Sequence, residues 1–371
     1  MPRMRVLAIA ILFPLLVCGV LWSLVLGNRA AAAPTATEYP VATCNEAGLV
    51  DAVALADVDP AGGLVTFAVC PVPAMIVLSS EILIGGDVTI DGLNRLFLRA
   101  GNNERHFTVR SGGKLTLLGM ALRDGEGITV GGSISVSNGG TLHTDGVLFF
   151  NNHTANTGGA IVAYNADLQM TDTTFLANSA GTIAGAINAG NSRLALDNVR
   201  LIRNSSSFVG GISAQGSQVD IRASEFLSNT ATTSASALEV TLGITQSGQL
   251  TITGSSFIGN SSRGSDGAIS VSNSDFLIRT SLFSRNLARS GSALKAFNGA
   301  GQIERSLFVM NGSLISTTEG AALSLYDSDV TILGSQFVAN VAERRGAAIN
   351  IDLTSDFSGA VEIIASTFAE N

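Results

Sequence analysis

The sequence predicts an all-β fold: a parallel β-helix solenoid with three strands per coil and a short N-terminal capping helix. The main observation is the motif Phe-x-x-Asn, which recurs along the second half of the 371-residue chain. By subtraction of residue numbers, successive Asn positions lie 25 to 31 residues apart. A period of that size is typical of solenoids rather than of globular cores with loops. The motifs are Phe149/Asn152, Phe175/Asn178, Phe226/Asn229, Phe257/Asn260, Phe283/Asn286, Phe308/Asn311, Phe337/Asn340 and Phe368/Asn371, and Leu201/Asn204 fills the one place that lacks Phe.

Composition is the second observation, and it favours strands and turns over helices. The chain has 41 Gly, 13% charged residues and lysine only at Lys114 and Lys295, so it lacks the Glu/Lys/Ala mixture of helical proteins. Removing Arg3, Arg5 and Arg29 of the N-terminal segment from the 21 basic residues leaves 18 against 29 acidic ones. Nucleic acid and anionic membrane surfaces are therefore disfavoured as partners, because binding phosphate requires concentrated Lys and Arg.

Residues 1–33 predict an export signal. Arg3 and Arg5 precede an apolar run from Val6 to Leu26, and the alanines at 30–33 offer a cleavage site between small residues. The apolar run is also long enough to span a bilayer, so an uncleaved membrane anchor is the alternative. In both cases we expect a protein that is secreted or held at the cell surface or outer membrane. Contact with a membrane would be made only through this segment, if it is not cleaved.

Residues 41–70 predict an N-terminal cap. Cys44 and Cys70 are the only cysteines beyond the signal, and an even pair in an exported chain suggests one disulfide, with two free thiols as the alternative. Closing this loop of about 26 residues would contribute roughly 3 kcal/mol. Thr43 and Glu46 have capping-box spacing and open a helix with Leu49 on its apolar face. We expect this helix to cover the open end of the solenoid, where strand edges and apolar side chains need a cover.

Residues 71–371 predict the solenoid itself, and each repeat aligns in three columns. The first column has two small residues before an alternating apolar pair, as in Gly159-Ala160-Ile161 followed by Ala163, which is a strand pattern of period two. The second is another alternating pair, as in Leu168/Met170, and the Phe follows five residues after its second member in every repeat. Because that offset is constant while the repeat length varies, the insertions must fall elsewhere.

Equivalent side chains of a parallel β-helix stack from coil to coil. We therefore expect the Phe positions, together with Leu201, to form a buried aromatic ladder. The Asn positions should form an amide ladder at a corner, where Asn tolerates left-handed backbone angles. The residues between the apolar members of the first strand should form an outward strip that faces solvent, with mostly small polar side chains: Val162, Asn188, Ser213, Glu239, Ser270, Lys295, Ser324 and Asn350.

Weaker repeats extend the solenoid towards the N-terminus. Phe107 and Ile134 open equivalent alternating pairs 27 residues apart, so the coils should begin well before the first Phe-x-x-Asn, near Val72. At the other end the sequence stops at Asn371, the last residue of a motif, and we expect a C-terminal end that is uncapped or that belongs to a longer chain. About eleven coils at roughly 4.8 Å each would make a rod of about 50 Å.

The combination of two motifs in register resembles a known family. Gly-Gly-Ala-Ile at 158–161 and Phe-x-x-Asn at 175–178 resemble the repeats of chlamydial polymorphic outer membrane proteins and of related bacterial surface β-helices. The resemblance covers residues 107–371. It implies a right-handed parallel β-helix and an exposed passenger with adhesive or interaction roles, and it implies little about a ligand.

Parallel β-helices of the pectin-lyase-like fold also carry polysaccharide lyases and glycoside hydrolases, so an enzyme is the alternative. Hydrolysis requires two neighbouring carboxylates, and lyases use an Asp/Glu cluster for calcium with an arginine base. Neither pattern is evident in the sequence. The three histidines, His106, His143 and His153, are expected to be solvated. We therefore predict no catalytic residue, no cofactor and no metal site.

The functional prediction is a non-catalytic, secreted or cell-surface β-helix that serves as an adhesin-like or structural module. A surface glycan or a protein is the candidate partner. A polysaccharide lyase or hydrolase with an unrecognised site is the runner-up, and a plain structural spacer is the third hypothesis.

Overall fold

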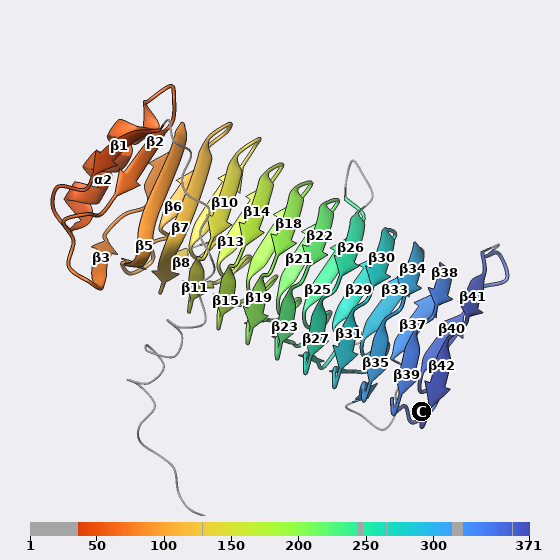
Figure 1. Cartoon of the computed structure of the whole chain (residues 1–371). Helices are drawn as coiled ribbons and strands as arrows, with labels where there is room; N and C mark the ends of the chain where they lie inside the picture. The colour runs from red at the N-terminus through yellow and green to blue at the C-terminus, as the bar shows by residue number, and fades with distance from the viewer. Residues whose placement is uncertain (1–35, 128, 244–247, 265, 314–321, 358) are drawn as a thin grey trace, which may run out of the picture.

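The computed structural model describes residues 36–127, 129–243, 248–264, 266–313, 322–357 and 359–371. In this part the chain is an all-β, right-handed parallel β-helix of about 12 turns with a single helix near the N-terminus. Figure 1 shows the coils following one another along a rod, from the helix at one end to β42 at the other. The fold class predicted from the sequence is confirmed.

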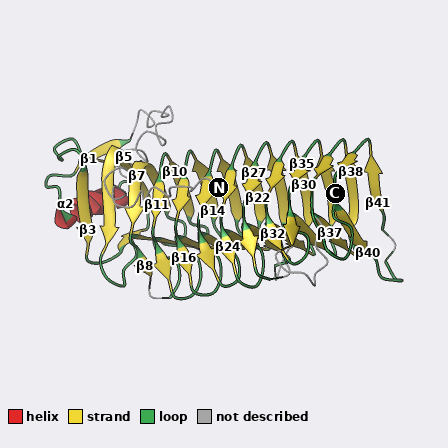
Figure 2. Ribbon diagram, turned by 90° about the horizontal axis from the view of Figure 1, so that it is seen from below, coloured by secondary structure: helices red, strands yellow, loops and turns green. Residues whose placement is uncertain are grey.

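Three parallel sheets run along the rod, and Figure 2 shows their strands stacked side by side. Sheet A has 23 strands: β1 (Thr37–Pro40), β2 (Gly63–Thr66), β3 (Ala74–Leu78), β5 (Asp87–Ala100), β7 (Lys114–Arg123), β10 (Thr141–Asp145), β11 (Leu148–Phe150), β14 (Asp167–Thr171), β15 (Thr174–Leu176), β18 (Arg193–Asp197), β19 (Arg200–Ile202), β22 (Gln218–Arg222), β23 (Glu225–Leu227), β26 (Gln249–Thr253), β27 (Ser256–Ile258), β30 (Asp275–Arg279), β31 (Leu282–Ser284), β34 (Ala300–Glu304), β35 (Leu307–Val309), β38 (Asp329–Leu333), β39 (Gln336–Val338), β41 (Val361–Ile364) and β42 (Thr367–Ala369). Sheet B has 11: β4 (Ile82–Ile84), β6 (Phe107–Val109), β9 (Ile134–Ser137), β13 (Ile161–Tyr164), β17 (Ile187–Gly190), β21 (Ile212–Gln215), β25 (Leu238–Thr241), β29 (Ile269–Ser272), β33 (Leu294–Phe297), β37 (Leu323–Tyr326) and β40 (Ile349–Asp352). Sheet C has eight: β8 (Glu126–Gly127), β12 (His153–Thr154), β16 (Ser179–Ala180), β20 (Ser205–Ser206), β24 (Thr230–Ala231), β28 (Ser261–Ser262), β32 (Leu287–Ala288) and β36 (Gly312–Ser313).

A coil takes one strand from sheet B, two from sheet A and one from sheet C, as in the run β13, β14, β15 and β16. The three predicted columns correspond to the three long strands of this run, and sheet C adds a fourth, two-residue strand. The chain turns between these strands at residues with left-handed backbone angles, namely Asn165 (φ 50°), Asp172 (φ 47°) and Ala177 (φ 53°). These turns make the coil close on itself within 25 to 31 residues.

Strand pairing keeps equivalent residues of successive coils in register. Ile161 pairs with Ile187, Leu168 with Leu194, and Phe175 with Leu201. The first members of these pairs are fully buried, because alternate residues of each strand point into the rod. The core is thus a set of columns that extend through the whole solenoid.

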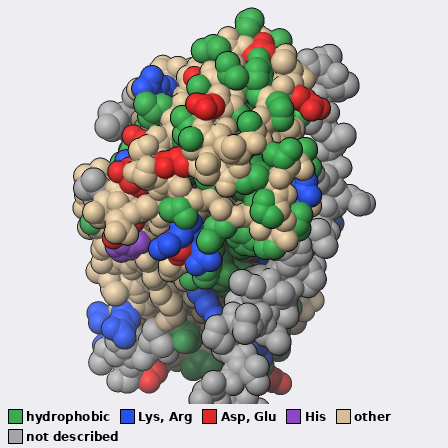
Figure 3. All heavy atoms as spheres, turned by 90° about the vertical axis from the view of Figure 1, so that its left-hand side faces the viewer, with side chains coloured by type: hydrophobic (Ala, Val, Ile, Leu, Met, Phe, Trp, Pro, Cys, Tyr) green, Lys and Arg blue, Asp and Glu red, His purple; other side chains and the backbone are tan. Residues whose placement is uncertain are grey.

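The N-terminal end is covered by α2 (Glu46–Asp57), whose buried face includes Leu49, Val53 and Ala56. The N-cap is Asn45, which accepts a hydrogen bond from the Gly48 N–H, and not Thr43 as the capping-box spacing predicted. Thr43 instead donates its hydroxyl to the Asn45 side chain. Figure 3 looks onto this end, where hydrophobic and acidic side chains are interspersed.

Several contacts hold the cap to the first coils, among them hydrogen bonds from Ser79 to the Glu46 carboxylate at the start of α2. A disulfide joins Cys44 and Cys70, with Cα atoms 5.4 Å apart, as the exported pair of cysteines predicted. At the other end of the helix, the Asp57 carboxylate accepts hydrogen bonds from the backbone N–H groups of Gly85 and Gly86, each at 2.8 Å. The cap is therefore fixed at both ends of α2.

The solenoid begins earlier than predicted. Strand β1 pairs with β2, and β2 pairs with β5, all in parallel within sheet A. The parallel pairing therefore starts at Thr37 and not near Val72, because β1 precedes the segment predicted as a cap, residues 41–70, and β2 lies within it. In the described part of the chain no helix has the length and apolarity needed to cross a bilayer, and the predicted signal, residues 1–33, lies outside the described residues.

Candidate functional site

The Phe positions form a stacked column inside the rod. Neighbouring rings are nearly parallel, with centroids 4.4 Å apart for Phe226 and Phe257 and 5.1 Å apart for Phe257 and Phe283. Leu201 interrupts the aromatic stack and is fully buried in the same column. Seven of the rings are fully buried and the eighth, in the last described coil, is 45% exposed: Phe149, Phe175, Phe226, Phe257, Phe283, Phe308 and Phe337, with Phe368 exposed. From Phe149 to Phe337 this column is buried and structural.

The Asn positions form an amide column that satisfies every polar atom of each side chain. The Oδ1 of Asn178 accepts from both N and Nδ2 of Asn152, and its Nδ2 donates to Oδ1 of Asn204 and to the carbonyl of Phe149. The same pattern continues along the rod through the side chains of Asn152, Asn178, Asn204, Asn229, Asn260, Asn286, Asn311, Asn340 and Asn371. Four hydrogen bonds use the full capacity of an amide, so these residues hold the corner and offer nothing to a ligand.

The left-handed residue at this corner is the one before each Asn, contrary to the expectation that the Asn itself takes that conformation. Ala177 (φ 53°), Arg203 (φ 54°) and Met310 (φ 55°) occupy it, although these side chains rarely adopt such angles. The turn removes the local backbone groups from the sheet ladder, and the following Asn replaces the lost hydrogen bonds. The amide column therefore stabilises the strained corner next to it.

A second polar column was not predicted. Serines two residues before the Phe receive a backbone N–H from the previous coil, as Ser281 Oγ does from Ser255 N at 3.2 Å, and donate to a carbonyl two residues back. A repeated Ser-x-Phe-x-x-Asn spacing in the sequence would have revealed it. Its members are Ser224, Ser255, Ser281, Ser306, Ser335 and Ser366.

The outward strip of sheet B is not open to solvent, which corrects the sequence prediction. Ser270 is 3% exposed and Ser324 is 7% exposed, and the remaining members are buried or half-buried. The turn that precedes each sheet B strand lies against this face: a Cβ at Gly131 would sit 2.8 Å from Cγ1 of Val162. The loops therefore cover the strip that strand alternation alone leaves outside.

Under these loops lies a network of charged and hydroxyl groups, which we call the carboxylate network: Glu239, Ser234, Asp266 and Lys295. The Ser234 hydroxyl lies 3.0 Å from Glu239 Oε1 and 2.8 Å from Asp266 Oδ2, and Lys295 Nζ donates to Asp266 Oδ1 at 2.7 Å. The Asp266 side chain is 15% exposed and that of Lys295 27%. Two carboxyl groups are thus brought together, a pair that the spacing of the acidic residues along the chain did not predict.

Both carboxyl groups of the network contact the same hydroxyl, that of Ser234. A hydroxyl carries a single hydrogen, so Ser234 can donate fully to only one of the two carboxyl groups at a time. Burial raises the pKa of Glu239 above its ordinary value, and the negative charge of Asp266 raises it further. If Glu239 is protonated, its carboxyl group can donate to Ser234, whose hydroxyl then donates to Asp266. All the groups are paired, which indicates a structural network rather than a substrate site.

The histidines differ from the prediction that all three are solvated. His106 is fully buried, with Nε2 3.1 Å from the Leu98 carbonyl and Nδ1 3.0 Å from Ser133 Oγ. Burial lowers the pKa of His106 from 6.5 to about 4, and because the carbonyl can only accept, Nε2 carries the proton of the neutral ring. His143 is half-buried and burial lowers its pKa too, whereas His153 is exposed.

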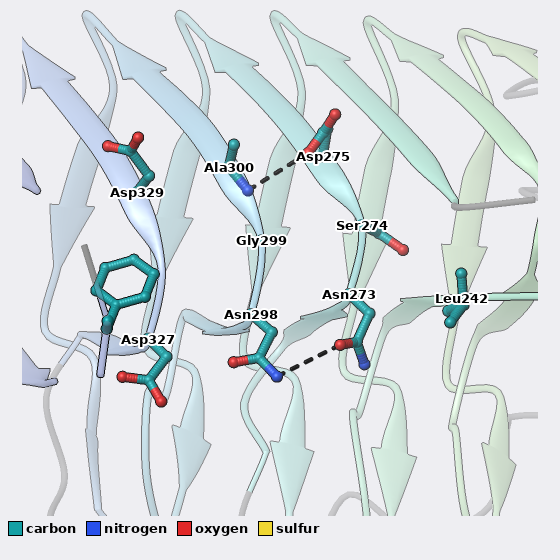
Figure 4. A pocket seen from close by; sticks show the side chains of 10 residues that line it. Leu242, Asn273, Ser274, Asp275, Asn298, Gly299, Ala300, Asp327 and Asp329 are labelled. Atoms are coloured by element: carbon teal, nitrogen blue, oxygen red, sulfur yellow. Dashed lines mark hydrogen bonds between the residues drawn. The ribbon is translucent and has the colours of Figure 1, made fainter. Parts of the chain in front are cut away.

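An open trough of about 570 Å³ lies on the outer surface at the corner between sheets B and A. Figure 4 shows two rows of side chains along it: Asn273, Asn298 and Asp327 in one, and Asp275, Ala300 and Asp329 in the other, with Gly299 between the rows. Leu242 and Phe357 also line it. The trough combines amide, carboxylate and apolar groups, which the ladders inside the rod do not present to solvent.

One end of the trough is held in place by Asp327. Its carboxylate accepts hydrogen bonds from the Thr354 N–H at 2.7 Å and from the Thr354 hydroxyl at 3.0 Å, and Phe357 N–H donates to the Thr354 carbonyl. Close by, Phe297 and Tyr326 of β33 and β37 stack at 5.0 Å on the outside of sheet B. Within the described residues no group of three or more His, Cys, Asp or Glu side chains could hold a metal ion.

No protein-family model matches the sequence, and no curated protein matches it. Solved structures with a similar course of the chain include PfbA, a surface adhesin of Streptococcus pneumoniae, at 12% identity and a TM-score of 0.45, covering 90% of this chain and 92% of that one. The catalytic unit of the GH87 α-1,3-glucanase of Streptomyces thermodiastaticus is similar at 13% identity and a TM-score of 0.36, covering 92% and 70%. The A-module of the mannuronan C-5 epimerase AlgE6 of Azotobacter vinelandii is similar at 10% identity and a TM-score of 0.37, covering 89% and 99%.

Proposed function

We propose that the protein is an exported, non-catalytic β-helix that binds a surface glycan or protein as an adhesin-like module. The open trough carries this proposal, because its amides, carboxylates and Phe357 face solvent while the interior polar columns are saturated by their own hydrogen bonds. The disulfide between Cys44 and Cys70 supports export, since such bonds persist in oxidising compartments. A cleaved signal at residues 1–33 and membership of the family of chlamydial surface repeats are parts of the same proposal.

Binding to arrays of cell-surface glycans and proteins tests this function. We expect the purified protein to bind at least one class of surface ligand, with no turnover of a polysaccharide panel with or without calcium. A blank on all arrays would leave the structural spacer as the remaining function, and turnover would replace binding by catalysis.

A glycoside hydrolase is the second candidate, and one observation favours it. Asp275 and Asp329 begin β30 and β38, which lie on either side of β34, so their positions are two strand spacings, or roughly 10 Å, apart. That separation is near the upper end for the carboxyl pair of inverting glycosidases. If turnover occurs, Asp275→Asn and Asp329→Asn should each abolish it, whereas Asp220→Asn, on the same sheet outside the trough, should not.

A further inference from the structure

We infer that the trough binds a linear oligosaccharide of neutral or cationic sugars that lies along the axis of the rod. This inference rests on the proposed binding function and specifies the ligand and its orientation. It follows from the period of the trough, from its two ends and from its charge.

The trough repeats at the spacing of the coils. Asn273, Asn298 and Asp327 each follow a sheet B strand, with left-handed φ of 48°, 49° and 41°, and their strands are in-register neighbours. Equivalent polar groups therefore recur about every 4.8 Å along the axis. The hydroxyl groups of a linear sugar chain also recur along a line. The length of one sugar ring is close to the spacing between two coils.

The amides of this row retain capacity for a ligand. Asn298 Nδ2 donates to Asn273 Oδ1 at a long 3.4 Å, and these two side chains make no other hydrogen bond with the described residues. One amide donates two hydrogens and its oxygen accepts, so Asn273 Nδ2 and Asn298 Oδ1 are available to sugar hydroxyls. The fully satisfied amides of the interior column contrast with this pair.

The two ends set the length of the ligand. Leu242 follows β25 and Phe357 belongs to the coil of β40 and β41, so four strand spacings, or roughly 19 Å, separate the ends. Between the rows the floor is Gly299 and Ala300. A Cβ at Gly299 would lie 2.4 Å from the Ser274 carbonyl oxygen, so a residue larger than glycine does not fit there. No side chain therefore projects from Gly299 into the trough. Phe357 supplies an apolar surface for the face of a terminal sugar.

The charge of the trough selects among sugars. Asp275, Asp327 and Asp329 line it, and the described lining residues include no Lys or Arg. Like charges facing each other across an interface are costly, so uronic acid polymers are disfavoured. Neutral hexose or pentose chains, and amino sugars with a free ammonium group, are compatible.

Calorimetric titration with oligosaccharides of two to six sugars tests the inference. The panel contains neutral gluco- and xylo-oligosaccharides, cationic chitosan oligomers and anionic oligogalacturonates. We expect a neutral or cationic series to bind, with an affinity that rises up to about four sugars, one per strand spacing, and then levels off. Oligogalacturonates should not bind.

Two variants locate the site. Asn298→Gly keeps the left-handed backbone without strain and should weaken binding roughly 5-fold through the lost hydrogen bonds. Phe357→Ala should weaken it roughly 10-fold through the lost ring contact. Asn165→Gly, at the same corner position (φ 50°) but outside the trough, is the matched control and should leave affinity unchanged.

Several outcomes would overturn the inference. They are a preference for oligogalacturonates, sugar binding that both variants leave unchanged, or binding to a protein but to no sugar. In each of these cases the proposed binding function still stands. Failure of the protein to bind any glycan or protein would overturn the proposed function as well.

Discussion

The periodic interior columns and the carboxylate network are both buried and polar, yet they are built on opposite principles. The Asn column is neutral, repeats in every coil from Asn152 to Asn371, and pairs each amide atom with its neighbours. The carboxylate network combines Glu239, Asp266 and Lys295 without repeating from coil to coil in the described residues, and burial raises the pKa of its Glu239. Repetition distributes stability along the rod, whereas a single network makes one part of it sensitive to pH.

This difference also predicts which substitutions lower the stability of the rod most. A stacked neutral column costs no charge desolvation, so each added coil gains a full set of hydrogen bonds and ring contacts. A half-buried set of charges gains Coulomb energy but loses hydration, and the balance is small. We therefore expect substitutions in the columns to cost far more than substitutions in the network.

The largest effect should come from the aromatic column. Phe257→Ala removes a fully buried ring between two others, with centroids 4.4 and 5.1 Å away, and should lower the free energy of unfolding by about 3–5 kcal/mol. Phe297→Ala is the matched control, because Phe297 also stacks, at 5.0 Å on Tyr326, but is 36% exposed. Urea denaturation should give a clearly smaller loss for the control, and equal losses would refute a dominant role of burial.

The amide column should give the next largest effect. Asn229→Ala removes the acceptor of Asn204 N and Nδ2 and the donor to the Leu201 carbonyl. Since each buried polar group left unpaired costs about 1–3 kcal/mol, we expect a loss of about 2–4 kcal/mol. Asn188→Ala removes an amide that donates to the exposed Tyr164 hydroxyl, and it should cost less than about 1 kcal/mol. Chemical denaturation compares the two, and similar losses would mean that the column is not cooperative.

The sequence was sufficient to predict the columns because stacking makes equivalent residues recur. Phe257 and Asn229 repeat at one period and one offset, so the period itself identifies the solenoid and which of its residues face the interior. The start of the coils was missed because β1 and β2 carry no motif, and they pair across an insertion that contains α2. The Asn45 cap was missed because two residues near the helix start had suitable side chains.

The aperiodic groups could not be predicted for a different reason. Asp266 lies in the variable segment between sheets C and B, so no offset relates it to Glu239 or Lys295. The outward strip was wrongly expected to face solvent because strand alternation does not reveal that loops fold over the strand. His106 was wrongly expected to be solvated. It lies just before β6, so the alternation of inward and outward residues along that strand does not predict which way its side chain points. The trough likewise combines two rows of side chains, one at the end of the sheet B strands and one at the start of the sheet A strands. The sequence does not show that both rows face the same recess.

His106 is a buried group outside the columns, and it should make the free energy of unfolding depend on pH in the acid range. The pKa of His106 is about 4 in the folded state against about 6.5 when unfolded, so the unfolded state binds more protons between these values. The contribution of His106 is full above pH 6.5 and is lost as pH falls towards 4, by about 3 kcal/mol in total. His106→Gln, which cannot titrate, should show a shallower loss of stability over this window in urea titrations. Identical slopes for the two proteins would contradict the buried, neutral ring.

The smallest effect, of opposite sign, should come from the carboxylate network. The raised pKa of Glu239 means that the folded state binds more protons, so its contribution is full below the ordinary Glu pKa and is lost as pH rises through the folded value. Glu239→Gln keeps a donor for Ser234 without the charge and should make stability at neutral pH slightly higher and less dependent on pH. Glu225→Gln, which removes a partly exposed ion pair with Arg200, is the matched control and should cost about 0–1 kcal/mol. Thermal denaturation between pH 4 and 9 distinguishes the two, and a loss of stability in Glu239→Gln at neutral pH would show that Glu239 is ionised and that its charge, rather than a shared proton, holds the network together.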